Sequence, residues 1–139
     1  MTTITVAVTV NAPLERVWTA WTQPQHITRW NFASPDWECP SASSDLRAGG
    51  SFSYRMAARD GSFAFDFGGV YREVSLHERL VSELGDGRRV QVDFGRLPDG
   101  QTRLTQAFEA EDQNPAEMQR QGWQAILENF KTHAESLPG

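Results

Sequence analysis

Cysteine is nearly absent from this sequence: Cys39 is the single one among 139 residues, so no intramolecular disulfide can form. This excludes the disulfide framework of many small secreted domains, and a reducing cytoplasm is the compartment we expect. The N-terminus, Met1-Thr2-Thr3-Ile4, lacks a basic region followed by an apolar one. We therefore expect no secretory signal.

Long apolar runs and concentrated basic charge are also missing. No stretch approaches the roughly 20 apolar residues that a membrane helix requires. The net charge is -5, and the basic residues stand singly or in pairs such as Arg88-Arg89. Nucleic-acid binding needs a concentrated basic face. We therefore expect neither a membrane span nor a nucleic-acid partner.

The sequence has few signs of catalysis. His26, His77 and His133 stand in unrelated segments without the spacing of metal ligands. There is no nucleophile elbow and no phosphate-binding loop. Cys39 lies in a polar segment, where a thiol nucleophile would need a histidine brought to it by the fold. We expect no metal and no cofactor, and we favour a protein that is not an enzyme.

Hydrophobic periodicity predicts the first elements. Residues 4–10 alternate Ile and Val with Thr and Ala, which is typical of a half-buried strand. Asn11 and Pro13 open a helix whose apolar residues recur at helical spacing. The run Thr22-Gln23-Pro24-Gln25 has the capping-box pattern and predicts a second short helix to about Trp30. Residues 31–49 are rich in Ser, Pro and Asp and predict a long loop with a short strand around residues 37–39.

The rest of the chain predicts an antiparallel meander followed by a long helix. Asp60-Gly61, Asp86-Gly87 and Pro98-Asp99-Gly100 separate β-rich runs between residues 50 and 110 and favour tight turns. Asn114 as cap and Pro115 at the first position start a helix to about Glu135. With no linker, repeat or low-complexity segment, residues 1–139 form one α+β domain.

Glycines next to aromatic residues are the most informative feature. The run Asp45-Leu46-Arg47-Ala48-Gly49-Gly50-Ser51-Phe52-Ser53-Tyr54 leads from a turn into an aromatic strand, Gly68-Gly69 lies in a second one, and Gly122-Trp123 lies in the final helix. Glycine allows close approach of backbones. These positions predict a curved sheet that wraps a helix and leaves a cavity. Gly122 falls in line with Met118, Ile126 and Phe130, which places it on the inward side, as cavity lining or as an ordinary core stripe.

These motifs carry a family resemblance. The D-L-R-x-G-G-x-F-x-Y run, the later Gly69, Tyr71 and Glu73, the step from Glu78 to Val81 and the Gly122-Trp123 helix resemble the activator of heat-shock protein 90 ATPase-like family. That family belongs to the START-like, SRPBCC superfamily. The resemblance runs from about Ile4 to about Leu137. It implies a helix-grip fold: a curved antiparallel sheet of six or seven strands around the long C-terminal helix, with two short helices after the first strand.

The resemblance, together with the aromatic strands, implies a small-molecule-binding module with an apolar cavity. The ligand would be a lipid, a polyketide or another hydrophobic or aromatic compound, bound by a monomer or homodimer. The predicted lining residues are aromatic or aliphatic: Trp30, Phe32, Trp37, Phe52, Tyr54, Phe65, Tyr71, Trp123, Ile126 and Phe130. For the first three, which lie in the second helix and the following loop, sealing of the core edge is the alternative.

A cyclase- or hydrolase-type enzyme is the first alternative function. Its candidate catalytic residues would be Asp66, Glu73, Tyr54 and Tyr71. Strand alternation around Asp66 favours phenylalanines inward and a solvated carboxylate, whereas an inward Asp66 would need a buried partner.

A chaperone-interacting stress-response protein is the second alternative. In the eukaryotic activators this type of domain is joined to a separate N-terminal domain, and both engage the chaperone. Because this chain starts directly at its first predicted strand, we do not expect a chaperone partner.

Overall fold

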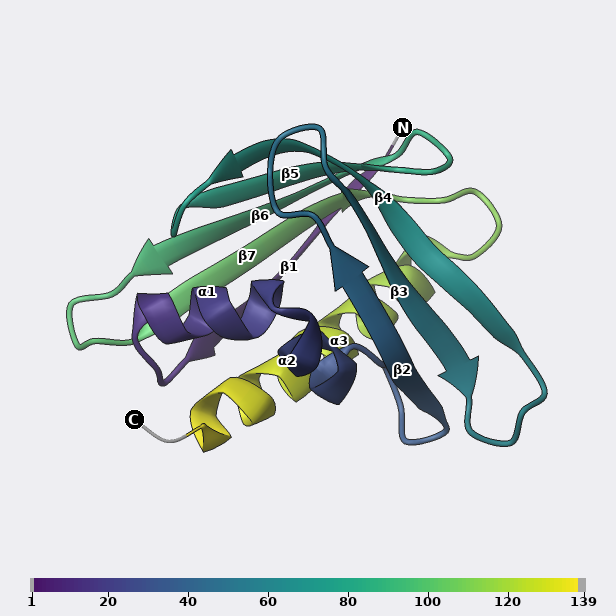
Figure 1. Ribbon diagram of the computed structural model, residues 1–139, viewed down its shortest axis with the longest axis horizontal. Coiled ribbons are helices and arrows are strands. Elements are labelled where there is room, and N and C mark those ends of the chain that lie inside the picture. Colours follow the sequence, from purple (N-terminus) through teal and green to yellow (C-terminus); the bar gives the residue numbers. More distant parts are fainter. Residues whose placement is uncertain (1, 138–139) are drawn as a thin grey trace.

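The computed structural model describes residues 2–137, which form one antiparallel sheet and three helices (Figure 1). In chain order the elements are β1 (Thr3–Val10), α1 (Leu14–Thr22), α2 (Pro24–Trp30), β2 (Trp37–Ser44), β3 (Ser51–Ala58), β4 (Ala64–Ser75), β5 (Arg79–Leu84), β6 (Arg89–Arg96), β7 (Thr102–Glu109) and α3 (Ala116–Ser136). The sheet has seven strands in the order β1-β7-β6-β5-β4-β3-β2. This is the expected α+β helix-grip fold.

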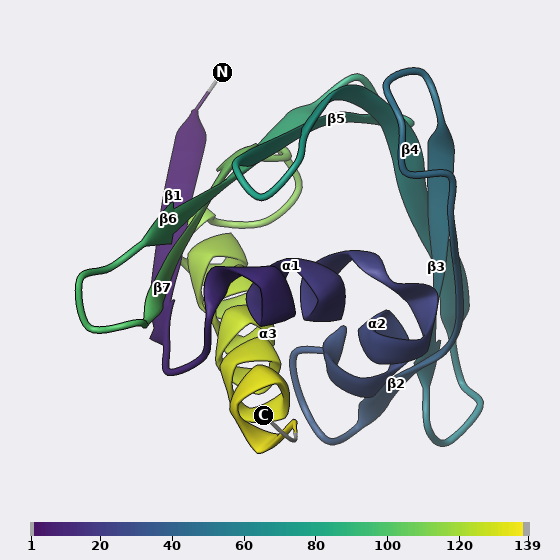
Figure 2. The same ribbon diagram turned by 60° about the vertical axis from the view of Figure 1, so that its left-hand side comes forward.

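The sheet curves around the helices, all of which lie on its concave side (Figure 2). Ile4, Val6, Val8 and Val10 of β1 are buried, as the alternation predicts. β1 pairs with β7 along its whole length and packs against α3. The long helix is thus held against one end of the sheet. No helix of residues 2–137 is long and apolar enough to cross a membrane.

An aromatic cluster joins the three helices. Trp21 of α1 stacks on Trp30 of α2, with ring centroids 4.7 Å apart. Phe130 of α3 meets both rings edge-on, at 5.0 Å from each. The Trp30 indole Nε1 donates a hydrogen bond of 2.9 Å to the carbonyl of Ala20. Aromatic pairs in this geometry stabilise beyond the area they bury, so the cluster fixes how α1 and α2 sit on α3.

The prediction of a long loop at residues 31–49 was wrong in one respect. Instead of a short strand around residues 37–39, the eight-residue strand β2 lies at the sheet edge and pairs with β3. Pairing with a neighbour overrides the low strand propensity of a serine-rich segment. The pairing is irregular between Glu38 and Ser41, where Pro40 lies. Proline is tolerated at such edge positions.

Both predicted caps also differ from the structure. The Thr22 hydroxyl donates to the carbonyl of Trp18, one turn back, and does not cap α2. The residue that precedes α3 in cap position is Pro115, not Asn114, and no side chain caps it. Gln119 organises this helix start instead: its amide accepts from the Glu111 N–H and donates to the carbonyls of Glu111 and Asn114.

Gly68 and Gly69 mark a close approach of backbones in β4. A Cβ atom added to Gly68 would overlap the carbonyl oxygen of Phe52 in β3, and one added to Gly69 would overlap the carbonyl oxygen of Glu83 in β5. The irregularity in the β4–β5 pairing lies further on, between Tyr71 and Glu73. The glycine pair therefore permits tight strand packing without changing which face the side chains occupy.

We predict that Gly69→Ala destabilises the protein by roughly 1–3 kcal/mol, because the new methyl group overpacks against backbone atoms that cannot move aside. Gly85→Ala is the control: its Cβ would meet nothing within 4 Å. Urea unfolding of the two variants measures both changes. Equal midpoints for Gly69→Ala and the unmodified chain would show that the strands have room to separate.

Two histidines join α2 to α3. His26 Nδ1 lies 2.9 Å from His133 Nε2, so one ring donates a hydrogen bond and the other accepts it. Burial lowers the pKa of His133 from its ordinary value of 6.5, and the positive charges of His26 and Arg29 add to this effect. The folded state therefore binds the His133 proton less tightly than the unfolded state.

We expect stability to fall as the pH drops below about 6.5, since the unfolded chain then takes up a proton that the folded one resists. His133→Gln keeps a hydrogen-bonding group but does not titrate, so it should flatten the pH dependence of the unfolding free energy between pH 8 and 5.5. The control is His77→Asn in the turn between β4 and β5, where asparagine tolerates the φ of 62°. Identical slopes for His133→Gln and the unmodified chain would contradict the prediction.

Candidate functional site

The main cavity has a volume of about 480 Å³ and lies between the concave face of the sheet and the helices. Five strands, β3 to β7, contribute side chains from alternate positions, which all point to the concave face. The helix α3 contributes side chains spaced three or four residues apart, which lie on one side of the helix. The lining consists of Trp21, Trp30, Asn31, Ala33, Phe52, Tyr54, Met56, Phe65, Phe67, Tyr71, Leu80, Ser82, Leu84, Arg88, Val90, Val92, Gln106, Glu111, Asn114, Met118, Gln119, Gly122, Trp123 and Ile126.

Aromatic rings form a continuous wall of this cavity. Phe52 contacts Tyr71 with ring centroids 5.0 Å apart, and Tyr54 stacks on Phe67 at 6.4 Å. Phe67 in turn meets Trp123 of α3 edge-on at 6.2 Å. The wall therefore runs from β3 across β4 to the long helix. A flat apolar molecule would find ring faces and edges to pack against.

The structure brings seven of the ten predicted lining residues together around the cavity: Trp30, Phe52, Tyr54, Phe65, Tyr71, Trp123 and Ile126. Ile126 and Trp123 project from α3, and the remaining side chains come from α2, β3 and β4. Strand alternation kept Phe65, Phe67 and Tyr71 on one face because the glycine pair between them is not a bulge.

The other three predicted residues lie elsewhere. Phe130 is fully buried in the aromatic cluster, because α1 and α2 press on α3 at that turn. Trp37, on the edge strand β2, packs against Phe63 and Phe65 at 6.2 and 6.0 Å. Phe32 lines a different pocket. Phe32 lies in the loop between α2 and β2, and no local sequence pattern predicts the path of that loop.

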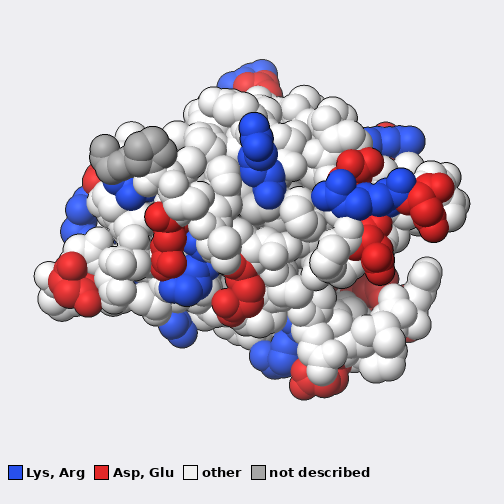
Figure 3. Space-filling view, turned by 90° about the horizontal axis from the view of Figure 1, so that it is seen from below, with Lys and Arg blue, Asp and Glu red and all other residues white. Residues whose placement is uncertain are grey.

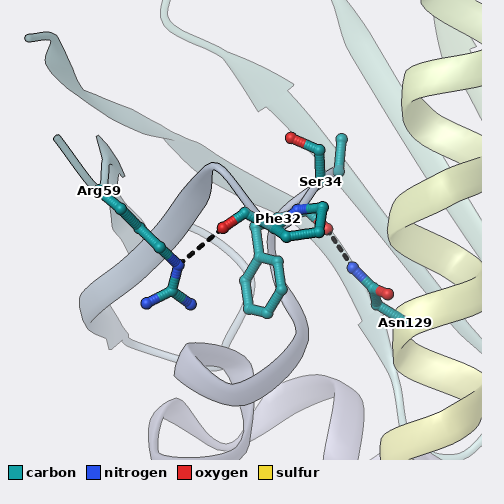
Figure 4. Close-up of a pocket in the computed structure, with 6 residues that line it drawn as sticks. Phe32, Ser34, Arg59 and Asn129 are labelled. Atoms are coloured by element: carbon teal, nitrogen blue, oxygen red, sulfur yellow. Dashed lines mark hydrogen bonds between the residues drawn. The ribbon is translucent and has the colours of Figure 1, made fainter.

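That second pocket, of about 400 Å³, lies between the 32–35 loop, Arg59 and α3 (Figure 4). The Asn129 amide donates to the carbonyl of Phe32, and Arg59 Nε donates to the carbonyl of Pro35 at 2.9 Å. The Arg59 guanidinium also lies 5.9 Å from the centre of the Phe32 ring. Because these groups already bind one another, they fix the loop, and the larger cavity is the candidate site.

Two of the candidate catalytic residues point away from the main cavity. Asp66 is exposed and accepts a hydrogen bond of 3.2 Å from Arg55, so the expectation of a solvated carboxylate is confirmed. Glu73 is exposed and accepts a hydrogen bond of 2.8 Å from the Ser75 hydroxyl. Neither carboxylate can reach a molecule in the cavity.

The two tyrosines do line the cavity. The Tyr71 hydroxyl lies 2.8 Å from Ser44 Oγ. Burial raises the pKa of Tyr54 well above its ordinary value of 10, and the neighbouring Tyr71 adds to the effect. Tyr54 therefore stays protonated at neutral pH and offers a hydrogen-bond donor rather than a base.

Cys39 is buried, and its Sγ lies 3.5 Å from the carbonyl of Ser41. Burial raises the pKa of this thiol, which disfavours the reactive thiolate. Within residues 2–137, no three His, Cys, Asp or Glu side chains come together in a way that could hold a metal ion.

Among the polar residues of the cavity that sequence reasoning missed, Ser82 and Gln106 are the two buried ones on strands. Ser82 stands between Leu80 and Leu84 in β5, and Gln106 stands between Leu104 and Phe108 in β7. The signal was present: each occupies the inward position of an alternating strand whose other inward residues are apolar. Polar residues are mostly exposed in folded proteins, so a polar residue at an inward position of a strand indicates a special role.

Charge on the molecular surface is mixed in sign. On the face in Figure 3, lysine and arginine side chains stand singly or beside acidic ones. Over the whole of residues 2–137, ion pairs such as Arg47 with Asp45, Arg55 with Asp66 and Lys131 with Glu135 mix the two signs of charge. Exposed pairs of this kind contribute little to stability.

Comparison with known proteins identifies relatives of the chain. The sequence model of one family, described as Activator of Hsp90 ATPase homolog 1-like protein, matches residues 11–135. No protein with a curated description matches the chain.

Solved structures of similar proteins share the fold. An AHSA1-like protein from Aeromonas hydrophila is 40% identical, with a TM-score of 0.87 over 96% of this chain and 93% of its own. A protein from Cytophaga hutchinsonii is 48% identical, with a TM-score of 0.82 over 95% of this chain and 91% of its own. A Chromobacterium violaceum protein, 24% identical with a TM-score of 0.83 over 99% of this chain and all of its own, has the same fold.

Proposed function

The chain belongs to the family of Activator of Hsp90 ATPase homolog 1-like proteins, with the START-like fold, and we propose that it binds a small hydrophobic or aromatic molecule in its main cavity. The observation that carries this proposal is the aromatic-walled space of about 480 Å³ between sheet and helix. Ligand sites typically measure about 300–1,000 Å³ and are lined by apolar side chains with a few polar groups. The cavity has these properties.

Gly122 supports this function independently. It lines the cavity from the middle of α3, and a Cβ atom added there would meet nothing within 4 Å. Packing against the sheet therefore does not require glycine at this position. A mid-helix glycine costs about 1 kcal/mol relative to alanine. We propose that it keeps space free for the ligand.

Neither alternative function gains support at this site. An enzyme would have to work with Tyr54 and Tyr71, because Asp66 and Glu73 point away from the cavity. The family's name refers to activation of the Hsp90 ATPase. No feature of the cavity bears on a chaperone, so we do not extend that activity to this chain.

Native mass spectrometry of the purified protein tests the proposal directly. We expect a population with the added mass of an organic compound, which dissociates on activation in the gas phase and whose mass identifies its chemical class. A preparation that carries no such compound and binds no hydrophobic probe afterwards would contradict the proposal.

Gly122→Leu should separate stability from binding. We predict that the leucine side chain extends into the open space, raises helix propensity by up to about 1 kcal/mol and reduces ligand binding. A thermal melt and a binding titration with a hydrophobic dye measure the two effects.

Gln121→Leu is the matched control, since residue 121 is exposed on the same helix and does not line the cavity. It should leave dye binding unchanged. Undiminished binding by Gly122→Leu would show that the ligand does not occupy this part of the cavity.

A further inference from the structure

Gln106 is a buried polar side chain that faces the cavity without a protein partner. It is 8% exposed and lines the cavity from β7, opposite Val92 of β6 and Val6 of β1. Within residues 2–137, no hydrogen bond joins its side-chain amide to another protein group, and the strand that carries it is paired on both sides, with β1 and with β6. Its carbonyl oxygen and amino group are both free to bind a ligand.

Ser82 is a second residue of this kind. It is 9% exposed and lies on β5, directly opposite Tyr71 of β4 and Val90 of β6. Its hydroxyl has no partner within the described chain, and the hydroxyl of its cross-strand partner Tyr71 is held by Ser44. β5 and β7 are separated by β6, and the register offsets Ser82 from Gln106 by two residues along the strands. Two strand spacings and two residues of rise place the two backbone positions roughly 12 Å apart.

The other buried polar residues show that a partner is the rule in this protein. Thr22 and Thr102 donate to backbone carbonyls, and Asn31 contacts the sulfur of Met56. Gln119 is the sharpest comparison, because it also lines the cavity and is also 8% exposed. Its amide makes three hydrogen bonds to the backbone at the start of α3. Gln119 thus has a structural role that Gln106 lacks.

No fully enclosed side-chain nitrogen or oxygen of residues 2–137 lacks a hydrogen-bond partner, so the Gln106 amide, to which the chain supplies none, is open to the cavity. A few polar groups of this kind in an apolar cavity are what orients a bound ligand. In the free protein only water in the cavity can bind the Gln106 amide. A ligand that supplies a matching group would replace that water without loss of hydrogen bonding.

The charged residues of the cavity already have partners. Arg88 Nε pairs with Asp86 at 2.7 Å, and Arg88 Nη1 donates to the carbonyl of Glu109. Glu111 accepts a hydrogen bond from the Asn114 amide. Tyr54 remains protonated because burial raises its pKa. The polar groups free to receive a ligand are therefore uncharged, which favours a neutral ligand.

We propose that Gln106 anchors a neutral, largely apolar ring compound through a carbonyl or hydroxyl group, with Ser82 as a second polar contact. This rests on the proposed function and specifies the ligand class. The ring system packs on the aromatic wall, and Gln106 fixes its orientation by donating to or accepting from the polar group.

Three compounds with the same tricyclic frame test this inference: fluorene, 9-fluorenone and fluorene-9-carboxylate. Their affinities can be measured by quenching of tryptophan fluorescence, since Trp21, Trp30 and Trp123 line the cavity. We expect fluorenone to bind about fivefold to tenfold more tightly than fluorene, as one net hydrogen bond provides. The carboxylate should bind most weakly.

Gln106→Met tests the anchor, because methionine has a similar length but no amide. It should abolish the preference for fluorenone and leave fluorene binding intact. Gln91→Met is the matched control: Gln91 lies on β6, outside the cavity, and its amide donates to Asp93 at 2.8 Å. This variant should keep the preference. Without ligand, Gln106→Met should melt at the same temperature as the unmodified chain or higher.

Each contrary result has its own meaning. Equal affinity of the unmodified chain for fluorene and fluorenone, or tighter binding of the carboxylate, overturns the inference but leaves the proposed function standing. The same holds if Gln106→Met retains the preference, or if it melts at a lower temperature, which would assign Gln106 a structural role. Failure of all three compounds to bind overturns the inference about the ligand class, whereas the proposed function falls only if native mass spectrometry also finds no bound compound. The comparison of compounds on the unmodified chain needs no variant to fold.

Discussion

The close approach of the β4 backbone to β3 and β5 at Gly68 and Gly69 is the constraint on which the rest of the fold depends. Side chains at these positions would force the three strands apart. With glycine, the sheet can bend across β4 while Phe65, Phe67 and Tyr71 stay on its concave face. The bend and the preserved alternation together produce a concave surface that is aromatic, because the inward positions on either side of the glycines are phenylalanine and tyrosine.

A second constraint acts at the other end of the molecule. Trp21, Trp30 and Phe130 fill the space between the three helices, and Ala20 accepts a hydrogen bond from Trp30. This cluster holds the C-terminal half of α3 firmly. Its N-terminal half meets the sheet at Trp123, which stacks on Phe108 at 3.9 Å. The helix is held at these two contacts and the sheet bends away from it between them. The cavity is the space that this arrangement leaves between the sheet and the helix.

Much of this could be predicted from the sequence, because local signals and global packing agree. The alternation of β1, the turn glycines and the helix periodicity each predicted an element that the structure has. Two of the errors share a cause: they concern positions whose role depends on partners far away in the sequence. Phe130 lies on the same helix line as Ile126, yet α1 and α2 cover it one turn later. β2 has a loop-like composition, but β3 supplies the pairing that makes it a strand.

Gln106 and Gln119 show that a clear sequence pattern does not predict whether a buried polar side chain finds a hydrogen-bond partner. Both glutamines are 8% exposed and both border the cavity. Gln119 lies near a helix start with free backbone groups, and its amide binds three of them. Gln106 lies in β7, whose backbone groups are already paired with β1 on one side and β6 on the other, so none remains for its side chain. The same side chain therefore stabilises the fold at one position and, at the other, leaves hydrogen-bonding capacity directed into an aromatic cavity.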